Sequence, residues 1–494
     1  MFLIGIQEDT TLQILTGLIG VFYFLVIVSL AFYGLHNLFT TILYLLMKTS
    51  KKHEGRARPL EKWPPVTIQL PIFNEKYTVE RLLHAVTCLD YPADCLQIQI
   101  LDDSTDDTLD LASQLVEEYK SRGVNIELIH RVNRQGYKAG ALNNGLRTAT
   151  GEFIAIFDAD FVPKRDWLKR TVPYFQNRKL GCIQTRWGHT NQQYNSLTRA
   201  EAMGIDGHFI IEQTVRSKNG FFLNFNGTAG LWRRACIEDS GGWQWDTLTE
   251  DLDLSYRAQM RGWKFDYLPD VVVPAELPPQ VEAFKKQQFR WAKGSFQVVR
   301  KILPTVLGES GLPWKVRIMA LLHLTGYFVH PLMLAILLLT LPVGLLMPEA
   351  FNIYPISIIA GLGPPLLYLT ATATYKTSFL KRIRCFPLLV IVGFGLSLST
   401  SIAVLEGLFS KGGTFIRTPK LNLDNSKQKK KIDRAYVAPL SSMVWAEIAL
   451  GVYALVTGIV LASWGLTPWM LLYMLGFFYI AGLNLIQHRP QTGD

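Results

Sequence analysis

Cysteine is scarce in this chain of 494 residues. The chain has five, Cys88, Cys95, Cys182, Cys236 and Cys385, and their spacing argues against both a disulfide framework and a cysteine metal site. No basic segment precedes the first apolar run and no small-residue cleavage site follows it, so a signal peptide is not expected. Reduced thiols in a cytosolic compartment are the simplest interpretation.

Apolar sequence, in contrast, is abundant. Hydrophobic residues make up 49% of the chain and its mean hydropathy is positive. This composition indicates that part of the chain is embedded in a lipid bilayer. At this length we expect two or three regions rather than one core. The net charge of +10 does not indicate nucleic acid, because the basic residues cluster beside apolar segments, where they would face anionic lipid. The clusters are Lys48, Lys51, Lys52, Arg56, Arg58 and Lys62, and residues 427–434.

Five apolar stretches are predicted to cross the membrane, at 12–47, 318–347, 353–375, 443–463 and 466–487. Residues 383–409 are also long enough, but a crossing there would place the basic residues of 411–434 outside. We therefore interpret 383–409 as a helix at the cytosolic interface. The positive-inside rule then puts the N-terminus outside, and the C-terminus and the domain after the first crossing in the cytosol.

The predicted organisation follows from these assignments. A transmembrane helix (1–47) and a basic cytosolic linker (48–63) precede an α/β domain (64–282). Amphipathic interface helices (283–317), two transmembrane helices (318–375), an interface helix with a basic loop (376–442), two more transmembrane helices (443–487) and a cytosolic tail (488–494) follow. We expect a multi-pass protein of the inner (plasma) membrane, in contact with its lipids.

Within the α/β domain, short apolar runs alternate with helical stretches. The runs are 66–71, 98–101, 126–129 and 153–157, and the helical stretches include 78–89, 107–122 and 138–149. This alternation predicts a mostly parallel sheet flanked by helices, with ligands at the carboxyl ends of the strands. Polar residues follow three of these strands: Asn74 and Glu75, Asp102 and Asp103, and Asp158 and Asp160.

Asp158 and Asp160 come just after the apolar run 153–157. Side chains two residues apart on an extended chain point to the same side, so both carboxylates can face one point beyond the strand. Two anions placed together are costly unless a cation lies between them. Mg²⁺ takes one or two carboxylates and completes its shell with water and phosphate. An acidic turn that caps the strand is the alternative for an isolated Asp-x-Asp.

Three other segments carry polar side chains with alternative interpretations. Asp102 can accept a hydrogen bond from a ribose hydroxyl or a base amide, or cap the next helix. Lys138 opens a predicted helix, where it can bind a diphosphate, or it is an ordinary surface lysine. Asn226 and Gly227 lie among small residues that let a substrate approach the backbone, or form a plain turn.

Two motifs in the second half of the domain also carry candidate chemistry. Asp251, in Thr-Glu-Asp ahead of a helix predicted over 254–261, is a candidate general base for a hydroxyl nucleophile, whereas Glu250 suits the helix dipole. Gln287, Arg290 and Trp291 lie on an amphipathic stretch. Arg290 can hold phosphate oxygens bidentately and Trp291 offers a flat face to a sugar ring, although a membrane-surface helix with a tryptophan anchor is the alternative.

In their order along the chain, these motifs resemble those of the membrane-embedded, processive family 2 glycosyltransferases, whose type members are the cellulose synthases. The motifs are Asp102-Asp103, Asp158-x-Asp160, Thr249-Glu250-Asp251 and Gln287-x-x-Arg290-Trp291. The sequences of 136–142 and 225–230 are most similar to the cellulose-synthase-like mannan and glucan synthases. The resemblance covers about residues 64–300.

A looser resemblance concerns Phe415-x-x-Thr418-x-Lys420, which is similar to the gating loop that covers the donor in cellulose synthases. Arg417 and Pro419 depart from the usual sequence of that loop. No cytosolic cyclic-dinucleotide-binding domain is expected after the last helix, so regulation of the bacterial cellulose kind is not expected.

The resemblance implies a GT-A fold and a nucleotide-diphosphate sugar donor, either UDP-glucose or GDP-mannose. It implies that Asp158 and Asp160 hold Mg²⁺ or Mn²⁺ and that Asp251 is the catalytic base of an inverting transfer that forms a β-linkage. The implied donor-binding residues are Asn74, Glu75, Asp102, Lys138, Asp158, Gln287 and Arg290, and the implied acceptor-binding residues are Asn226, Gly227, Glu250 and Trp291.

We therefore predict a β-glycan synthase that elongates a polysaccharide in the cytosol and passes it through its own helices, with envelope export partners left open. The alternative enzyme is a lipid glycosyltransferase that adds a sugar to diacylglycerol or ceramide, since ceramide glucosyltransferases share the Arg-Trp ending. A transporter with an α/β regulatory domain is a third interpretation, but it leaves Asp251 and the Arg290-Trp291 pair unexplained.

Overall fold

The computed structural model describes residues 10–49, 60–348, 354–375, 379–414, 417–424 and 440–488. Several predictions fall on residues outside these ranges. They are most of the basic linker (50–59), Phe415 of the gating-like loop, the basic cluster 427–434 and the tail from residue 489.

The α/β domain is built on one seven-stranded sheet. Its strands are β1 (Val66–Ile72), β2 (Leu96–Asp102), β3 (Ile126–His130), β4 (Phe153–Ile156), β5 (Leu180–His189), β6 (Gly230–Arg233) and β7 (Lys264–Ala275), in the spatial order β3-β2-β1-β4-β6-β5-β7. Only β6 runs antiparallel to its neighbours, β4 and β5, while β1 to β4 pair in parallel. The predicted, mostly parallel sheet is therefore confirmed.

Helices cover both faces of this sheet. One face packs against α2 (Val79–Thr87), α3 (Thr108–Ser121) and α5 (Trp167–Thr171). The other packs against α4 (Tyr137–Gly145), α8 (Arg234–Asp239) and α9 (Glu250–Met260). The short turns η1 (Ala93–Cys95) and η2 (Val172–Gln176) complete this part. A sheet with buried apolar faces on both sides accounts for the continuous apolar runs of β1 and β4.

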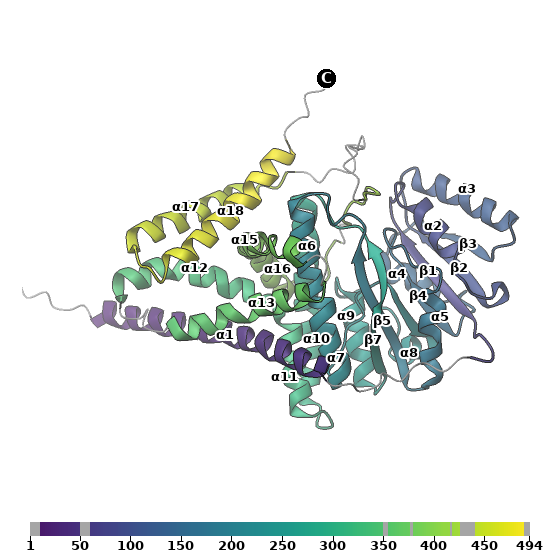
Figure 1. The fold of residues 1–494 in the computed structure, drawn as a ribbon, viewed down its shortest axis with the longest axis horizontal. Helices are drawn as coiled ribbons and strands as arrows, with labels where there is room; N and C mark the ends of the chain where they lie inside the picture. The colour runs from purple at the N-terminus through teal and green to yellow at the C-terminus, as the bar shows by residue number, and fades with distance from the viewer. Residues whose placement is uncertain are drawn as a thin grey trace, which may run out of the picture.

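A layer of helices lies between the sheet and the apolar helices (Figure 1). It contains α6 (Ser196–Asp206), the π-helix η3 (Gly207–Gln213), α7 (Thr214–Asn219), α10 (Val281–Gly308) and α11 (Trp314–Leu324). α10 is one continuous helix over most of the predicted interface segment. The side chains of Val298, Ile302 and Val306 on α10 pack with α11 and with Tyr256 of α9, so α10 connects the sheet domain to the membrane part.

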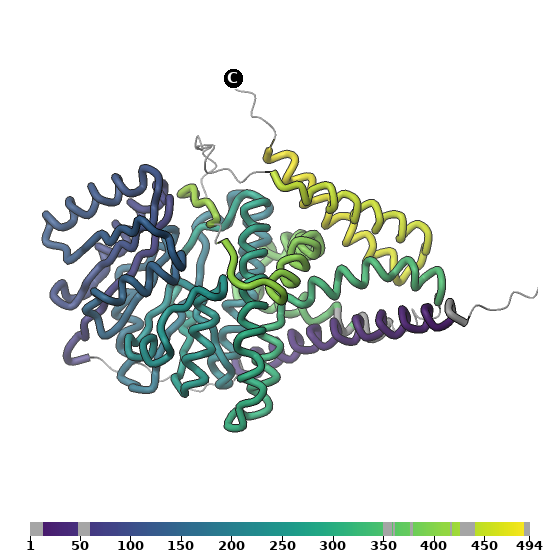
Figure 2. Tube along the Cα trace, turned by 180° about the vertical axis from the view of Figure 1, so that it is seen from behind, coloured from purple at the N-terminus to yellow at the C-terminus, as the bar shows by residue number. Residues whose placement is uncertain are grey.

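The apolar helices extend away from the sheet domain in both views (Figures 1 and 2). They are α1 (Thr10–Thr49), α12 (Val329–Leu346, after the turn η4, Gly326–Phe328), α13 (Tyr354–Ala373), α17 (Met443–Leu461) and α18 (Thr467–Gln487). Within the described residues, four helices are long and apolar enough to cross a membrane: Gln13–Met47, Gly326–Leu346, Met443–Leu461 and Thr467–Gln487. The chain is thus a membrane protein.

Two further helical segments, 353–375 and 383–409, fall on predicted apolar stretches. α13 falls on the predicted crossing 353–375 and packs along α1, so closely that a Cβ built on Gly363 would lie 1.9 Å from the carbonyl oxygen of Gly34. The predicted interface segment 383–409 forms α15 (Phe386–Gly395) and α16 (Ser397–Phe409), after the short α14 (Phe379–Ile383). The helical stretch Phe379–Gly395 bends by 48° relative to Ser397–Phe409, and the pair is apolar enough for one broken span. The interface assignment stays a prediction.

Candidate active site

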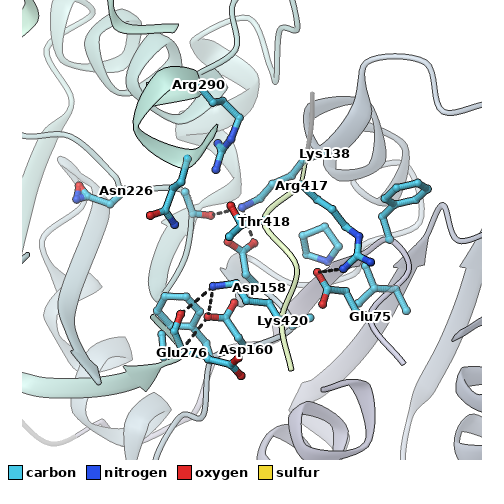
Figure 3. A pocket seen from close by; sticks show the side chains of 18 of the residues that line it. Glu75, Lys138, Asp158, Asp160, Asn226, Glu276, Arg290, Arg417, Thr418 and Lys420 are labelled. Carbon is cyan, nitrogen blue, oxygen red and sulfur yellow. Dashed lines mark hydrogen bonds and ion pairs between the residues drawn. The ribbon is translucent and has the colours of Figure 1, made fainter. Parts of the chain in front are cut away.

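An open cleft with an empty volume of about 1280 Å³ lies at the carboxyl ends of β1, β4, β5 and β7. Most of the predicted site residues line this cleft, although they come from seven separate segments of the chain. They are Glu75, Lys138, Asp158, Asp160, Asn226, Gly227, Glu250, Asp251, Gln287, Arg290, Trp291, Thr418 and Lys420. Several of them are labelled in Figure 3. The structure thus brings together side chains that are up to about 345 positions apart in the sequence.

Two residues with predicted donor-binding roles are placed outside the wall of this cleft. Asp102 is fully buried, and its Oδ2 lies 2.6 Å from Nδ1 of His130. The neighbouring Asp103 lines the cleft instead and is held by the guanidinium of Arg131, with Nε 2.7 Å from its Oδ1. The side-chain oxygen of Asn74 accepts from the backbone N–H of Thr105 at 2.8 Å. The contacts of Asn74 and Asp102 with the donor stay predictions. Of the two adjacent pairs, Asn74-Glu75 and Asp102-Asp103, it is Glu75 and Asp103 that face the cleft.

Asp158 and Asp160 each face a lysine (Figure 3). Lys138 Nζ lies 2.5 Å from Asp158 Oδ1, and Lys420 Nζ lies 2.8 Å from Asp160 Oδ2. That Asp160 oxygen also accepts from the backbone N–H of Glu276 at 3.0 Å. Within the described residues no group of three or more acidic, histidine or cysteine side chains surrounds one point. Two carboxylates nevertheless suffice for Mg²⁺ or Mn²⁺ when phosphate oxygens complete the shell.

Lys138 lies at the centre of the charged groups. Burial opposes its charge, but Asp158, Glu250 and Asp251 hold the pKa of its ammonium above the ordinary value. The ammonium also donates to the carbonyl of Gly227 at 3.1 Å. An ammonium held in this way between acids and a carbonyl is suited to bind an incoming phosphate.

Gly227 occupies a position where a side chain would be both crowded and strained. Its φ of +83° belongs to the left-handed region, and a Cβ there would lie 3.0 Å from Asp251 Oδ2 and 3.4 Å from Lys138 Nζ. A side chain at this position would both strain the backbone and push on the two charged groups. The glycine therefore lets the 225–230 segment approach Asp251.

We expect Gly227→Ala to lower kcat by about tenfold or more, because small displacements of reacting groups cost large factors in rate. The measurement is the steady-state rate, per folded protein, of the sugar transfer that the sequence resemblance implies. Gly220→Ala is the matched control, since Gly220 has a φ of +66° but open space around its Cβ position. An equal loss of kcat in both variants would mean that backbone strain alone causes the effect. It would contradict a role for the contact of the new side chain with Asp251 and Lys138.

Asp251 lies in the first turn of α9, which begins at Glu250 and not at residue 254 as predicted. The extension is reasonable because acidic residues stabilise the first turn of a helix. Asp251 Oδ1 accepts from the N–H of Leu252 at 2.8 Å. Burial and the neighbouring Glu250 raise the pKa of Asp251 to about 7, against the attraction of Lys138. A carboxyl with this pKa can take a proton near neutral pH.

Gln287, Arg290 and Trp291 lie on one face of α10, at positions i, i+3 and i+4. Burial lowers the pKa of Arg290, while Glu250, Asp251 and Asp158 counteract this. The indole of Trp291 lies 6.5 Å from that of Trp187, between ring centres, at 55°. The predicted Gln-x-x-Arg-Trp motif thus faces the cleft.

The acceptor candidate Asn226 is held by the π-helix η3. Its side-chain oxygen accepts from Gln213 at 2.9 Å, and its Nδ2 lies 3.2 Å from Nε2 of His208. His208 Nδ1 in turn lies 2.8 Å from Glu212 Oε2. π-helical turns are frequent at functional sites, so η3 places Asn226 where the cleft meets the membrane part.

In the gating-like segment, the described residues 417–424 include three that line the cleft, Arg417, Thr418 and Lys420 (Figure 3). Arg417 Nη1 lies 3.6 Å from Glu75 Oε1. Burial raises the pKa of Glu75 to about 8, although Arg417 acts in the opposite direction. Thr418 is buried. The segment therefore contacts both the β1 side and the β4 side of the cleft.

Glu276 was not predicted from the sequence, yet it holds this segment in place. Its two carboxylate oxygens accept from the backbone N–H groups of Leu421 at 2.9 Å and Leu423 at 3.0 Å. Lys420 also donates to its carbonyl at 2.8 Å. The signal was available, because Glu276 directly follows β7, as Asp158 and Asp160 closely follow β4.

Comparison with known proteins gives consistent matches. Residues 64–294 match the family model described as "Glycosyltransferase like family 2". The chain is 39% identical over 308 residues to glucomannan 4-beta-mannosyltransferase 2 of Arabidopsis thaliana, covering 60% of this chain and 57% of the relative. It is 42% identical over 259 residues to glucomannan 4-beta-mannosyltransferase 9 of the same plant, covering 51% and 49%. The chain thus spans about half the length of these curated relatives.

Among solved structures, the mannosyltransferase PcManGT of Pyrobaculum calidifontis, in complex with GDP-Man and Mn²⁺, matches with a TM-score of 0.51 and 22% identity. The match covers 78% of this chain and 99% of that one. At this identity the likeness concerns the fold alone. It confirms the expected α/β architecture of the GT-A kind, here flanked by apolar helices.

Proposed function

We propose that this chain, whose residues 64–294 are a family 2 glycosyltransferase domain of the cellulose-synthase-like kind, extends a β-linked polysaccharide from a nucleotide-diphosphate sugar. One observation carries the proposal. Asp251, with a pKa raised to about 7, lines the same cleft as Asp158, Asp160, Arg290 and Trp291. A poised base, paired acids and cationic groups in one cleft are what transfer from a diphosphate leaving group requires.

The donor side of the cleft is assigned by charge. Lys138 and Arg290 would bind the diphosphate, with Gln287 beside Arg290, and Glu75 would lie toward the nucleoside. Seven of the lining residues are acidic and five are lysine or arginine, so an oxygen-only site at Asp158 and Asp160 suits a divalent cation. Bound there, Mg²⁺ or Mn²⁺ would offset the charge that develops on the leaving diphosphate.

The transfer itself is assigned to Asp251. Its carboxylate takes the proton of the acceptor hydroxyl as that oxygen forms a bond to C1 of the sugar. The bond from C1 to the donor phosphate breaks in the same displacement, and the diphosphate leaves with the electron pair. A single displacement inverts the anomeric centre and converts an α-linked donor into a β-linkage. Trp291, Asn226, Gly227 and Glu250 would place the acceptor.

The donor sugar is proposed to be mannose from GDP-mannose, with UDP-glucose as the alternative. The names of the two plant relatives, both glucomannan 4-beta-mannosyltransferases, support mannose. The polymer is proposed to pass between the apolar helices, from a cytosolic active site across the inner (plasma) membrane. The position of the cleft next to η3 and α10, against the membrane part, supports this route. The proposal also keeps the domain boundaries that were predicted from the sequence.

The test uses membranes that contain the full chain, incubated with labelled GDP-mannose or UDP-glucose and either Mg²⁺ or Mn²⁺. We expect a labelled polymer from GDP-mannose that β-mannanase degrades. Incorporation from UDP-glucose into a product cut by β-glucanase would replace the donor assignment. A lipid-sized product without polymer would instead identify a lipid glycosyltransferase.

A further inference from the structure

A single side chain, that of Gln297 on α10, bonds two segments that lead into the cleft. Gln297 is 1% exposed. Its Oε1 accepts from the backbone N–H of Leu248 at 2.8 Å, and its Nε2 donates to the backbone carbonyl of Gly412 at 2.6 Å. A carboxamide can accept through its oxygen and donate through its nitrogen at the same time, without carrying a charge.

Each of these bonds is close to a residue that the proposed reaction uses. Leu248 lies three positions before Asp251, and Gly412 lies five positions before Arg417 and eight before Lys420. The two segments also touch each other, since a Cβ built on Gly413 would lie 3.3 Å from Leu248 Cδ1. Gln297 therefore lies where the segment that carries the base meets the segment that enters the cleft.

The helix that carries Gln297 is fixed on both sides. Lys301 Nζ lies 2.9 Å from Asp253 Oδ1 on α9. Lys293 Nζ lies 2.8 Å from Glu406 Oε2 on α16. These ion pairs join α10 to α9 and to α16 about one turn on either side of Gln297.

We propose that Gln297 is a positioning residue. It fixes the start of the helix that carries Asp251, and the segment that leads to residues 417–424, relative to α10. A displacement of either segment is then transmitted to the other through the amide. Its kinetic consequence rests on the proposed function, whereas the mechanical coupling does not.

The test is hydrogen exchange on the full-length chain in detergent. Gln297→Met keeps the side-chain length and removes both hydrogen bonds. Gln297→Glu keeps an acceptor for Leu248 but sets an oxygen against the carbonyl of Gly412. We expect Gln297→Met to speed exchange in 244–252 and in 410–424 together, and Gln297→Glu to speed it chiefly in 410–424. Ser295→Ala, which removes only a hydrogen bond to the Leu324 carbonyl, is the control on the same helix and leaves both segments unchanged.

Steady-state kinetics give the second readout. We expect Gln297→Met to lower kcat by about tenfold per folded protein, and Gln297→Glu to act mainly on the KM of the donor. Wild-type exchange in either segment of Gln297→Met would overturn the proposal, as would equal acceleration by Ser295→Ala. If the wild-type chain transfers no sugar, the proposed function fails, while the exchange experiment still decides the role of Gln297.

Discussion

Replacing Asp251 by asparagine lowers sugar transfer by about two to four orders of magnitude, the range expected for the loss of a general base. The amide keeps the size of the carboxyl group and can still accept from Leu252 N–H, but it cannot take a proton. Product formation from labelled donor is the measurement. Glu238→Gln, which alters an exposed ion pair with Arg234 on α8, is the control. Full activity in Asp251→Asn would remove the catalytic assignment.

Asp251→Asn is also expected to change how the stability of the protein depends on pH. The folded pKa of Asp251, about 7, lies above the unfolded value of about 3.9. The native state therefore holds a proton that the unfolded chain releases, and this contribution to stability is lost as the pH rises from about 4 to about 7. Asp251→Asn lacks this dependence, so its melting temperature relative to wild type rises over that interval. Wild-type activity rises with pH through about 7, as the carboxylate forms. A melting-temperature difference that does not change with pH would contradict the raised pKa.

Replacing Asp160 by asparagine is expected to lower transfer by about a hundredfold or more, as for other groups that stabilise charge in a transition state. The change removes a carboxylate from the proposed cation site and the charged partner of Lys420. Titration with Mn²⁺ at fixed donor concentration is the measurement, and the variant needs far more metal for half-maximal rate. Asp166→Asn, in the exposed N-cap of α5, is the control. An unchanged Mn²⁺ curve would contradict the metal assignment.

The first half of the fold was predictable because its signals are local. The apolar runs of β1 to β4 and the helices between them have the periodicity of buried strands and amphipathic helices, and each predicted range overlaps the observed element. β5, β6 and β7 were not predicted. β6 is a four-residue strand, and β7 contains Pro269 and Pro274, which weaken a strand pattern. Their pairing partners are distant in the sequence, so only the folded sheet reveals them.

The site was predictable to the extent that strand ends and motif spacing determine it. Alternation along a strand shows that adjacent residues face opposite ways, but not which one faces the ligand. The resemblance to the family implied Asp102, whereas in the structure Asp103 lines the cleft. The contact of Arg417 with Glu75 joins segments more than 340 positions apart, and no local pattern encodes such a pair. The roles of these residues in binding the donor and the acceptor stay predictions.

The lysine partners of Asp158 and Asp160 have a consequence for the order of binding. Each carboxylate already has a counter-ion from the chain, Lys138 or Lys420. At the proposed metal site, a free divalent cation would have to compete with both ammonium groups, which would weaken its binding in the absence of nucleotide. A nucleotide diphosphate offers those ammonium groups new anionic partners. On the proposed function, metal and nucleotide would therefore enter together as a chelate, and the exchange of counter-ions would leave the total charge of the cleft almost unchanged.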